Sequence, residues 1–348
     1  MKLVQLNQLK PLRAALAVLA IGAATVAASA AQAADYKPHI IRFGYGLVVE
    51  SNQGRAARFF AEDLAKRTDG KLNMKTFGAA SLGSDIQMQN ALIGGAQEMM
   101  VGSTTTLVGI VDDFGVYDLP FMFANEKEAD AVLDGPFGQK LLDKLQSKGL
   151  VGLVYWENGF RDLTNSKHPI AKMDDFKGIK LRVMQNPMYI DLFNAMGANA
   201  IPLAFSDLFT ALESRTVDGQ ENPINTVESS KFYEVQKYLS ISHHVYTPFI
   251  VLASKQWWDG LSADEKAAIQ ASAAAARDSE RKDTRAESAR ILEQLKQQGM
   301  QVNTVSDDEL AHMREVAKPV VDKFGASSPA HAELVKDMQA DLAKLRGK

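Results

Sequence analysis

The sequence predicts an α/β fold with a mainly parallel sheet. Short apolar strand patterns alternate with helical patterns, and this alternation starts again after about residue 160. Strands separated by helices indicate an α/β layer. Roughly 315 residues remain after an export leader, and chains of this size usually divide into two lobes.

The first 33 residues have the order of a secretory signal peptide. Lys2, Lys10 and Arg13 form a basic start, an apolar run covers 14–28, and Ala31-Gln32-Ala33 is a cleavage site of the A-x-A type. The alternative is an uncleaved membrane anchor, but no stop-transfer pattern follows. No later segment reaches 18 apolar residues, so we expect a soluble protein in the periplasm that does not insert into a membrane.

Charge and cysteine content narrow the class of function. Without the leader, the 39 basic and 42 acidic residues become 36 against 42, a net charge of −6. An acidic protein is a poor candidate for binding nucleic acid. The chain has no cysteine, which excludes disulfides, thiolate metal sites and cysteine nucleophiles.

Each lobe has its own expected elements. The first should contain strands at 39–45, 71–77, 98–102 and 150–156, with helices at 52–67 and from Ser84-Asp85 to Gly94. The second should contain strands at 161–165, 179–184 and 216–220 and a helix from about Ser206. Strands at 239–242 and 249–253 could pass between the two.

A long helical stretch covers about 262–298. Ser262 with Glu265 at the third position forms a capping box, and no glycine or proline interrupts the stretch before Gly299. One helix of about 35 residues would extend over roughly 50 Å. It would therefore lie across both lobes, and the alternative is two helices with a break.

The strand at 179–184 carries the strongest candidate for ligand binding. Its alternation places Ile179, Leu181 and Val183 on one face and Arg182 on the other. Asn186-Pro187 follows, which is typical of a helix N-cap. Ligands of open α/β sheets lie beyond the carboxyl ends of strands, and a guanidinium favours a carboxylate. We expect Arg182 to bind a small anion next to Asn186, the alternative being a salt bridge on a solvated strand edge.

Other polar residues stand at strand and helix ends. Arg161 could contact the same carboxylate or be an ordinary loop arginine. Asn222 and Glu221 lie at a second strand-to-helix junction, where we expect Asn222 to cap the helix. Phe205 would form the floor of the pocket or belong to the core. The first lobe offers Asn52, Asp85 and Ser103, as ligand contacts or as solvated loop residues.

Searches for catalytic motifs give little. There is no complete dinucleotide fingerprint, nucleophile elbow, P-loop or zinc-protease motif. His243 and His244 are adjacent on a strand, so they point to opposite faces and cannot readily share a metal. We expect no cofactor and no metal ligand set, although the sequence leaves open whether a cation binds.

Several motifs together resemble a known family. They are Gln97-Glu98-Met99, Asp118-Leu119-Pro120-Phe121, the segment 178–182, Ala204-Phe205-Ser206, the segment 218–223 and the segment 231–236. Over the whole mature chain they resemble the periplasmic solute-binding subunit of tripartite ATP-independent periplasmic (TRAP) transporters, the DctP family.

The resemblance implies a site and a mode of action. By this resemblance, Arg182 would bind the substrate carboxylate, Arg161 and Asn222 would assist it, and Phe205 would line the site. Two periplasmic-binding-protein-like lobes, joined by crossover strands and a long helix, would close on the ligand. The loaded protein would then dock on a membrane permease, and we expect it to be a monomer.

The implied lobes are 34–158 with about 247–287, and 159–246 with about 288–348. Thr105 stands where sialic-acid binders have an arginine, which disfavours that ligand. The segments 155–161, 186–188 and 243–246 resemble the subgroup that binds six-carbon sugar acids such as 2,3-diketogulonate. We therefore favour a uronate, aldonate or keto-sugar acid over a C4 dicarboxylate.

Two rival functions are also compatible with the sequence. An exported lyase or hydrolase acting on acidic sugars would need an acid and a base, for which Glu157, Asp207 and Glu221 are available. A signalling ectodomain that reports the solute to a sensor would need a docking partner.

Overall fold

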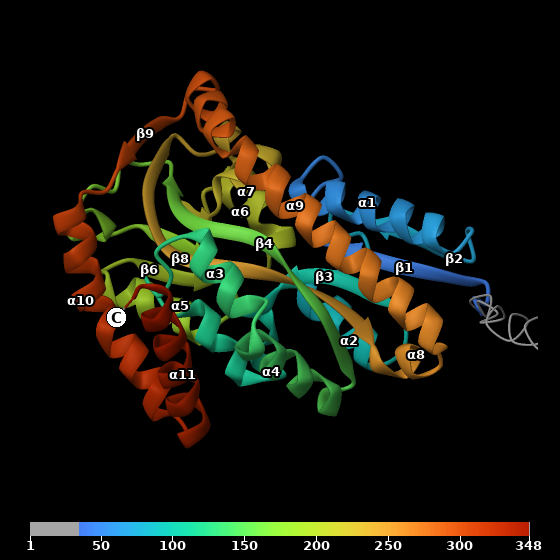
Figure 1. Cartoon of the computed structure of the whole chain (residues 1–348). Coiled ribbons are helices and arrows are strands. Elements are labelled where there is room, and N and C mark those ends of the chain that lie inside the picture. Colours follow the sequence, from blue (N-terminus) through green and yellow to red (C-terminus); the bar gives the residue numbers. More distant parts are fainter. Residues whose placement is uncertain (1–34, 348) are drawn as a thin grey trace, which may run out of the picture. The chain divides into compact units, whose positions relative to one another are not determined.

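In the computed structural model, which describes residues 35–347, two long strands run through the middle of one mixed sheet (Figure 1). They are β4 (Leu150–Asn165) and β8 (Tyr238–Ser254), and they pair antiparallel. The sequence patterns predicted two short strands in each of these ranges, whereas the structure joins each pair into one strand. Gly159 has φ 115° and the register shifts between Glu157 and Gly159, so the chain forms a β-bulge there instead of a turn.

The strand order is β2-β1-β3-β8-β4-β7-β5-β6, with β9 beside β8. The shorter strands are β1 (His39–Tyr45), β2 (Leu72–Phe77), β3 (Met99–Ser103), β5 (Lys180–Val183), β6 (Asn199–Pro202), β7 (Gly219–Asn222) and β9 (Gln301–Thr304). Pairing is parallel among β1, β2 and β3 and among β5, β6 and β7, as predicted. It is antiparallel where β3 and β7 meet the long strands.

The α-helices of the first lobe and its edge are α1 (Asn52–Arg67), α2 (Asp85–Ile93), α3 (Glu126–Leu133), α4 (Pro136–Lys144) and α8 (Lys255–Asp259). Those of the second lobe are α5 (Pro187–Ala195), α6 (Leu208–Glu213) and α7 (Ile224–Ser229). The chain ends with α9 (Ala263–Gln297), α10 (Asp307–Ala326) and α11 (Pro329–Leu345). Short 3-10 turns include η1 (Thr104–Gly109), η2 (Asp112–Asp118) and η5 (Phe205–Asp207).

The first strand and helix confirm the predicted bounds at 39–45 and 52–67. Ser51 is the N-cap of α1, and its side chain accepts a hydrogen bond from the Gly54 N–H. The structured region from η1 to α4 had no counterpart in the prediction. Its first part is made of 3-10 turns, which carry no helical hydrophobic period that a sequence pattern could reveal.

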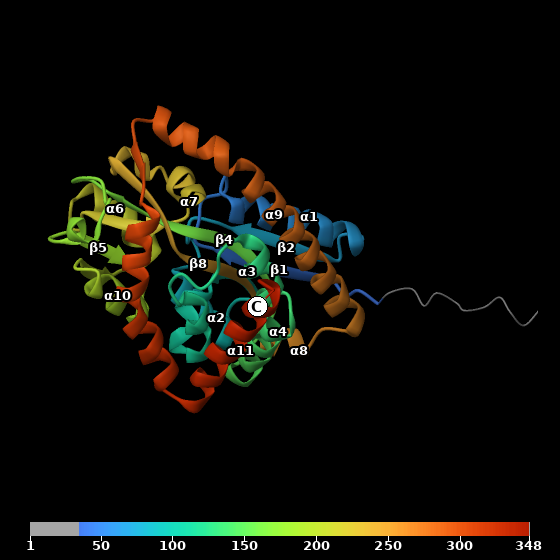
Figure 2. The ribbon, with the colours of Figure 1, turned by 60° about the vertical axis from the view of Figure 1, so that its left-hand side comes forward.

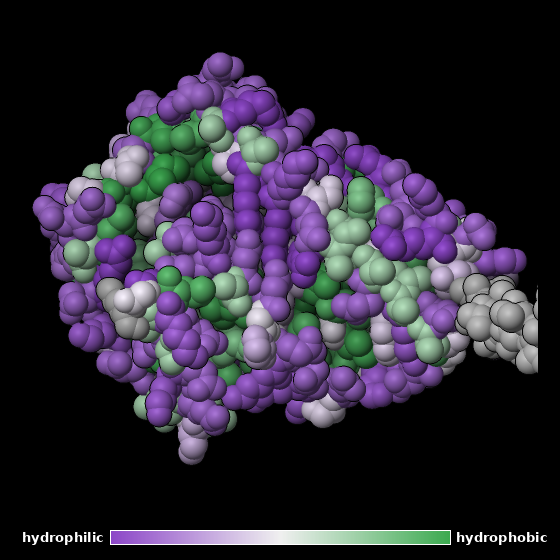
Figure 3. All heavy atoms as spheres, viewed as in Figure 1, coloured by the Kyte–Doolittle hydropathy of each residue, from purple (hydrophilic) through white to green (hydrophobic). Residues whose placement is uncertain are grey.

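Helix α9 is continuous over 35 residues, so the alternative of two helices is wrong. Its N-terminal part packs on α1 and β4, while Ile291 and Leu295 near its end join a core with Leu208 and Leu239 of the second lobe. The helix therefore spans both lobes, as predicted. In the space-filling view, the surface over the middle of α9 is hydrophilic (Figure 3).

The buried cores lie on the two faces of the sheet in each lobe. In the first lobe, Phe43 and Phe60 pack edge to face with ring centroids 5.6 Å apart, next to the buried Trp156. In the second lobe, Leu181 and Phe193 belong to a core that α10 completes through Met313.

Helices α10 and α11 form a hairpin at the end of the described chain. Helix α10 contacts α5, whereas α11 turns back towards η2 and α3 (Figure 2). The hairpin thus touches both lobes, and the lobe limits given above stay a prediction. No helix within 35–347 has both the length and the apolar character needed to cross a bilayer. The predicted signal peptide lies outside the described residues.

Candidate ligand-binding site

A cavity opens at the carboxyl ends of β1, β3, β5 and β7, between the lobes. Its empty volume, including the space at its mouth, is about 640 Å³. The lining is formed by Gly46, Leu47, Gln53, Ala80, Ser84, Asp85, Ser103, Thr106, Asn158, Arg182, Met184, Gln185, Leu203, Ala204, Phe205, Ser206, Asn222, Thr226 and Phe249. Five of the nine predicted site residues line this cavity: Arg182, Asn222, Phe205, Asp85 and Ser103.

Arg182 lies on β5 and is only 2% exposed. Its Nε and Nη2 donate to the backbone oxygen of Leu203, at 2.9 and 2.7 Å. Its Nη1 is buried and has no hydrogen-bond partner within residues 35–347. Burial lowers the pKa of Arg182 to about 10, and the nearby charge of Arg161 acts in the same direction. Arg182 remains a cation at neutral pH, and its side chain lines the cavity.

The segment after β6 places Phe205 at the cavity wall. Phe205 begins η5, and its ring packs at an angle of 54° against Phe232, with centroids 6.1 Å apart. The ring is partly buried and also contacts two hydrophobic cores. Both expectations for Phe205, pocket wall and core, therefore describe its position.

Asp85 brings a carboxyl group to the first-lobe side of the cavity. It is the first residue of α2, after the N-cap Ser84, and its Oδ2 accepts a hydrogen bond from the Ser103 N–H at 3.0 Å. Burial raises the pKa of Asp85 to about 6, although this hydrogen bond and the charge of Arg182 oppose the shift. The Oγ of Ser103 accepts from the Thr105 N–H at 3.3 Å.

Arg161 and Glu221 form a fully buried ion pair behind the cavity. Both Nε and Nη2 of Arg161 bind the Glu221 carboxylate, and Nη2 also donates to the Glu221 backbone oxygen at 2.6 Å. His244 Nε2 lies 3.2 Å from Glu221 Oε2. Burial acts to raise the pKa of Glu221, but Arg161 and His244 outweigh it, so the pKa is lowered. Neither member of the pair lines the cavity.

Asn222 connects this ion pair to the cavity. Its Oδ1 accepts from Arg161 Nη2 at 3.2 Å, and its Nδ2 donates to Gln220 Oε1. The prediction that Asn222 caps the next helix is wrong, because the N-cap of α7 is Pro223. The Asn222 side chain is held by its strand neighbours instead.

Asn186 and Asn52 lie away from the cavity lining. Asn186 caps α5, as predicted, by accepting from the Met188 N–H at 2.9 Å, and its Nδ2 donates to Asp118 at 2.8 Å. Asn52 donates to the Glu157 backbone oxygen and to Glu280 Oε1, at 3.1 and 2.9 Å. Both side chains therefore make structural contacts between separate segments.

Several polar residues of the lining were not predicted, among them Gln53, Asn158 and Thr226. Asn158 precedes the bulge glycine of β4, and its Nδ2 donates to Thr247 Oγ1 at 3.0 Å. An Asn-Gly pair normally indicates a turn, so nothing in the sequence indicated that Asn158 lies on a strand that passes between the lobes.

His244 is buried and His243 exposed, so the two histidines point apart, as predicted.

Comparisons with known proteins agree with this geometry. The model of the family described as bacterial extracellular solute-binding protein, family 7, matches residues 43–328. The chain is 38% identical over 296 residues to the 2,3-diketo-L-gulonate-binding periplasmic protein YiaO of Escherichia coli, across 85% of this chain and 90% of that protein. It is 32% identical over 290 residues to the C4-dicarboxylate-binding periplasmic protein DctP of Rhodobacter capsulatus, across 83% and 87%.

The chain is also similar to a protein of known crystal structure. The sugar acid binding protein DctPAm from Advenella mimigardefordensis strain DPN7T, crystallised in complex with galactonate, has 52% sequence identity and a TM-score of 0.87. The match covers 89% of this chain and 99% of that one.

Proposed function

Because the chain belongs to family 7 of the bacterial extracellular solute-binding proteins, the solute-binding subunits of TRAP transporters, we propose that it captures the anion of a six-carbon sugar acid in the cavity at Arg182. The observation that carries this proposal is the buried Nη1 of Arg182, which has no partner within residues 35–347. A buried cationic donor without a partner is costly. A ligand carboxylate would remove that cost and form a charge-assisted hydrogen bond.

The cavity lining favours a sugar acid over a C4 dicarboxylate. Among the described residues that line it, Arg182 is the single lysine or arginine. A dicarboxylate would leave its second carboxylate without a cationic partner and near Asp85. The other polar groups are neutral amides and hydroxyls, such as Gln53, Asn158 and Thr226. These groups, with the Asp85 carboxyl as an acceptor, suit a chain of hydroxyl groups.

The relatives support the same choice. The more similar of the named relatives bind a keto-sugar acid and galactonate, and the named C4-dicarboxylate binder is less similar. We propose a uronate, an aldonate or 2,3-diketogulonate as the ligand class.

Binding is proposed to proceed by closure of the lobes, without chemical change of the ligand. Strands β4 and β8 and helix α9 pass from one lobe to the other and provide the hinge. The three acids considered for catalysis do not line the cavity: Glu221 pairs with Arg161, Glu157 pairs with Arg285 and Asp207 is exposed. A lyase or hydrolase would need an acid and base pair at the ligand, whereas Asp85 is the single carboxylic acid among the described residues that line the cavity. The closed, monomeric protein is proposed to deliver the ligand to a TRAP permease from the periplasm.

A ligand panel tests this proposal. Purified protein is screened by thermal shift and titration calorimetry against galactonate, glucuronate, galacturonate, 2,3-diketogulonate, succinate and malate. A tight ligand raises the melting temperature, since binding to the native state stabilises it by RT ln(1 + [L]/Kd). We expect a shift with at least one sugar acid and none with the C4 diacids, and recovery of unchanged ligand. Binding of C4 diacids alone would overturn the ligand class, and conversion of the ligand would overturn the assignment as a binding protein.

A further inference from the structure

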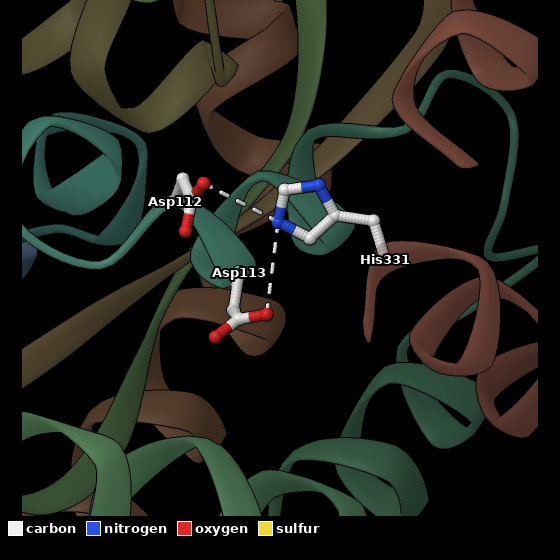
Figure 4. A group of neighbouring side chains, drawn as sticks. All are labelled: Asp112, Asp113 and His331. Atoms are coloured by element: carbon white, nitrogen blue, oxygen red, sulfur yellow. Dashed lines mark ion pairs between the residues drawn. The ribbon is translucent and has the colours of Figure 1, made fainter. Parts of the chain in front are cut away.

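Three side chains that the binding site does not use converge on one point at the end of the chain. Asp112 and Asp113 begin η2, and His331 lies in the first turn of α11 (Figure 4). His331 Nε2 is 3.6 Å from Asp112 Oδ2 and 3.6 Å from Asp113 Oδ1. The three donor atoms lie within 4.8 Å of one another.

The neighbours of His331 fix which ring nitrogen carries the proton. Ser327 Oγ donates to the Phe324 backbone oxygen at 2.6 Å, so it acts as an acceptor towards His331 Nδ1, which lies 2.6 Å away. Nδ1 is therefore the protonated nitrogen of the neutral ring, and Nε2 keeps a lone pair. The ring is also stacked on Phe324, with centroids 4.4 Å apart and an interplanar angle of 14°. Its orientation is thus set from two sides.

The free nitrogen of this ring points at two acceptors. His331 is 5% exposed, and its Nε2 lies 3.6 Å from each carboxylate, beyond hydrogen-bond distance. A separation of 3.6 Å from each carboxylate is too long for the charge-assisted hydrogen bond of a protonated ring, which spans about 2.7–2.9 Å. A cation bound at this point would be attracted by both carboxylates and by the nitrogen lone pair of the neutral ring.

The 3.6 Å separations of His331 Nε2 from the two carboxylates suit a divalent metal ion. Zinc binds imidazole nitrogen and carboxylate oxygen at about 2.0–2.2 Å in tetrahedral geometry, which separates adjacent donors by roughly 3.3–3.6 Å. A ligating imidazole usually donates from its other nitrogen to a fixed acceptor, as Nδ1 does to Ser327. We propose that Asp112, Asp113 and His331 form a binding site for Zn²⁺ or a similar first-row divalent cation.

The surrounding charges leave the site available to a cation. Asp113 uses Oδ2 for an ion pair with Lys144 at 2.7 Å and keeps Oδ1 for the metal. The two carboxylates and the ammonium together give a local charge of −1, and an imidazole binds a metal in its neutral form. The Asp112 side chain is 77% exposed, so solvent can supply the fourth ligand. The ion would join η2 to the hairpin of α10 and α11, which contacts both lobes.

Zinc titration of chelator-treated protein, purified without a polyhistidine tag, tests the site. We expect calorimetry and metal analysis to find one Zn²⁺ per chain, and Co²⁺ to give the visible absorption of a tetrahedral N/O site. His331→Gln and Asp112→Asn should each weaken binding at least tenfold. Ser327→Ala, which removes only the acceptor for Nδ1, should weaken it by about 10–100-fold. The matched control is His312→Gln, an exposed histidine beside the single carboxylate of Glu309, which should bind Zn²⁺ as the unchanged protein does.

Asp112→Asn changes an exposed side chain and tests the proposal even if His331→Gln fails to fold. Stoichiometric binding that Asp112→Asn and Ser327→Ala leave unchanged would overturn the site. So would the absence of binding at 100 μM Zn²⁺. The sugar-acid titration, repeated in the presence of a chelator, reports on Arg182 separately.

Discussion

Arg182 donates two hydrogen bonds, from Nε and Nη2, to one acceptor, the backbone oxygen of Leu203. This contact fixes the plane of the guanidinium before any ligand arrives. Nη1 is then the nitrogen without a hydrogen-bond partner within residues 35–347. A donor that is already oriented loses little conformational entropy on binding, so the contact contributes to affinity through preorganisation.

The first prediction concerns this guanidinium. Arg182→Ala should lower the affinity for the bound acid at least 30-fold, because a charge-assisted contact is worth about 2 kcal/mol or more and each 1.4 kcal/mol is a factor of ten. Arg182→Lys should also bind poorly, since an ammonium cannot bind Leu203 with two donors and still present a third in the same plane. Calorimetric titration measures both, with the exposed Arg290→Ala as control. Affinity within threefold of the unchanged protein in either Arg182 variant would contradict the assignment.

A second prediction concerns the contribution of the buried Arg161–Glu221 ion pair to folding stability. Glu221→Gln leaves the buried Arg161 without a neutralising charge, and breaking a buried ion pair costs about 3–5 kcal/mol. We expect the free energy of unfolding in urea to fall by roughly that amount. Asp191→Asn, which breaks the exposed pair with Lys323, should change it little.

The double variant Arg161→Met/Glu221→Leu refines the same test. Removing both charges should recover most of the stability that Glu221→Gln loses, because no unpaired buried charge remains. If the two variants are equally unstable, the ion pair is not the source of the loss.

The sequence predicted the parts of this site that follow from local rules. Arg182 on an alternating strand and Asn186 as the cap of α5 depend on residues next to each other in the chain. The pairing of Arg161 with Glu221 joins residues 60 positions apart, and no pattern in either segment encodes it.

In the fold, too, features set by local sequence were predicted and features set by contacts between distant segments were not. Strand and helix ranges at 39–45 and 52–67 followed from periodicity and caps. The continuity of β4 did not, because Asn158-Gly159 has the composition of a turn and only its pairing with β8 keeps it in the sheet. Asn222 likewise has the residue type of a cap, but Arg161 and Gln220 bind its side chain.

A third prediction concerns Asp85, whose pKa burial raises to about 6. An acid whose folded pKa lies above the unfolded value of 3.8 stabilises the fold only at low pH, and that stability is lost as the pH rises through 6. Asp85→Asn should therefore make the unliganded protein more stable at pH 8. It should also weaken binding of a polyhydroxylated acid about tenfold, because the amide replaces a charged acceptor for a hydroxyl.

Urea unfolding at pH 8 and calorimetry with the ligand check the two effects of Asp85→Asn. Greater stability with unchanged affinity would show that Asp85 does not contact the ligand. Lower stability would contradict the raised pKa.

The last prediction concerns Glu280, a buried acid where α9 meets α1 and β4. Its carboxyl group accepts from the Glu157 N–H and from Asn52 Nδ2, both at 2.9 Å. Burial raises its pKa to about 7 from 4.5, so it should lower the free energy of unfolding as the pH rises from about 4.5 through 7. The loss should be about 3 kcal/mol by pH 8, because the shift from 4.5 to about 7 is 2.5 pKa units and each unit is worth about 1.4 kcal/mol. Glu280→Gln cannot ionise and should lack this part of the pH dependence.

Unfolding in urea at pH 5, 6, 7 and 8, followed by the fluorescence of the buried Trp156 and the other tryptophans, measures this for both proteins. Asp85 and Asp118, whose pKa values burial raises to about 6 and about 7, act in the same direction in both. The difference between the two curves therefore isolates Glu280. It should shift in favour of Glu280→Gln as the pH rises, since only the unchanged protein must bury a new charge. Parallel curves would mean that the Glu280 carboxyl is as easily ionised in the fold as in the unfolded chain.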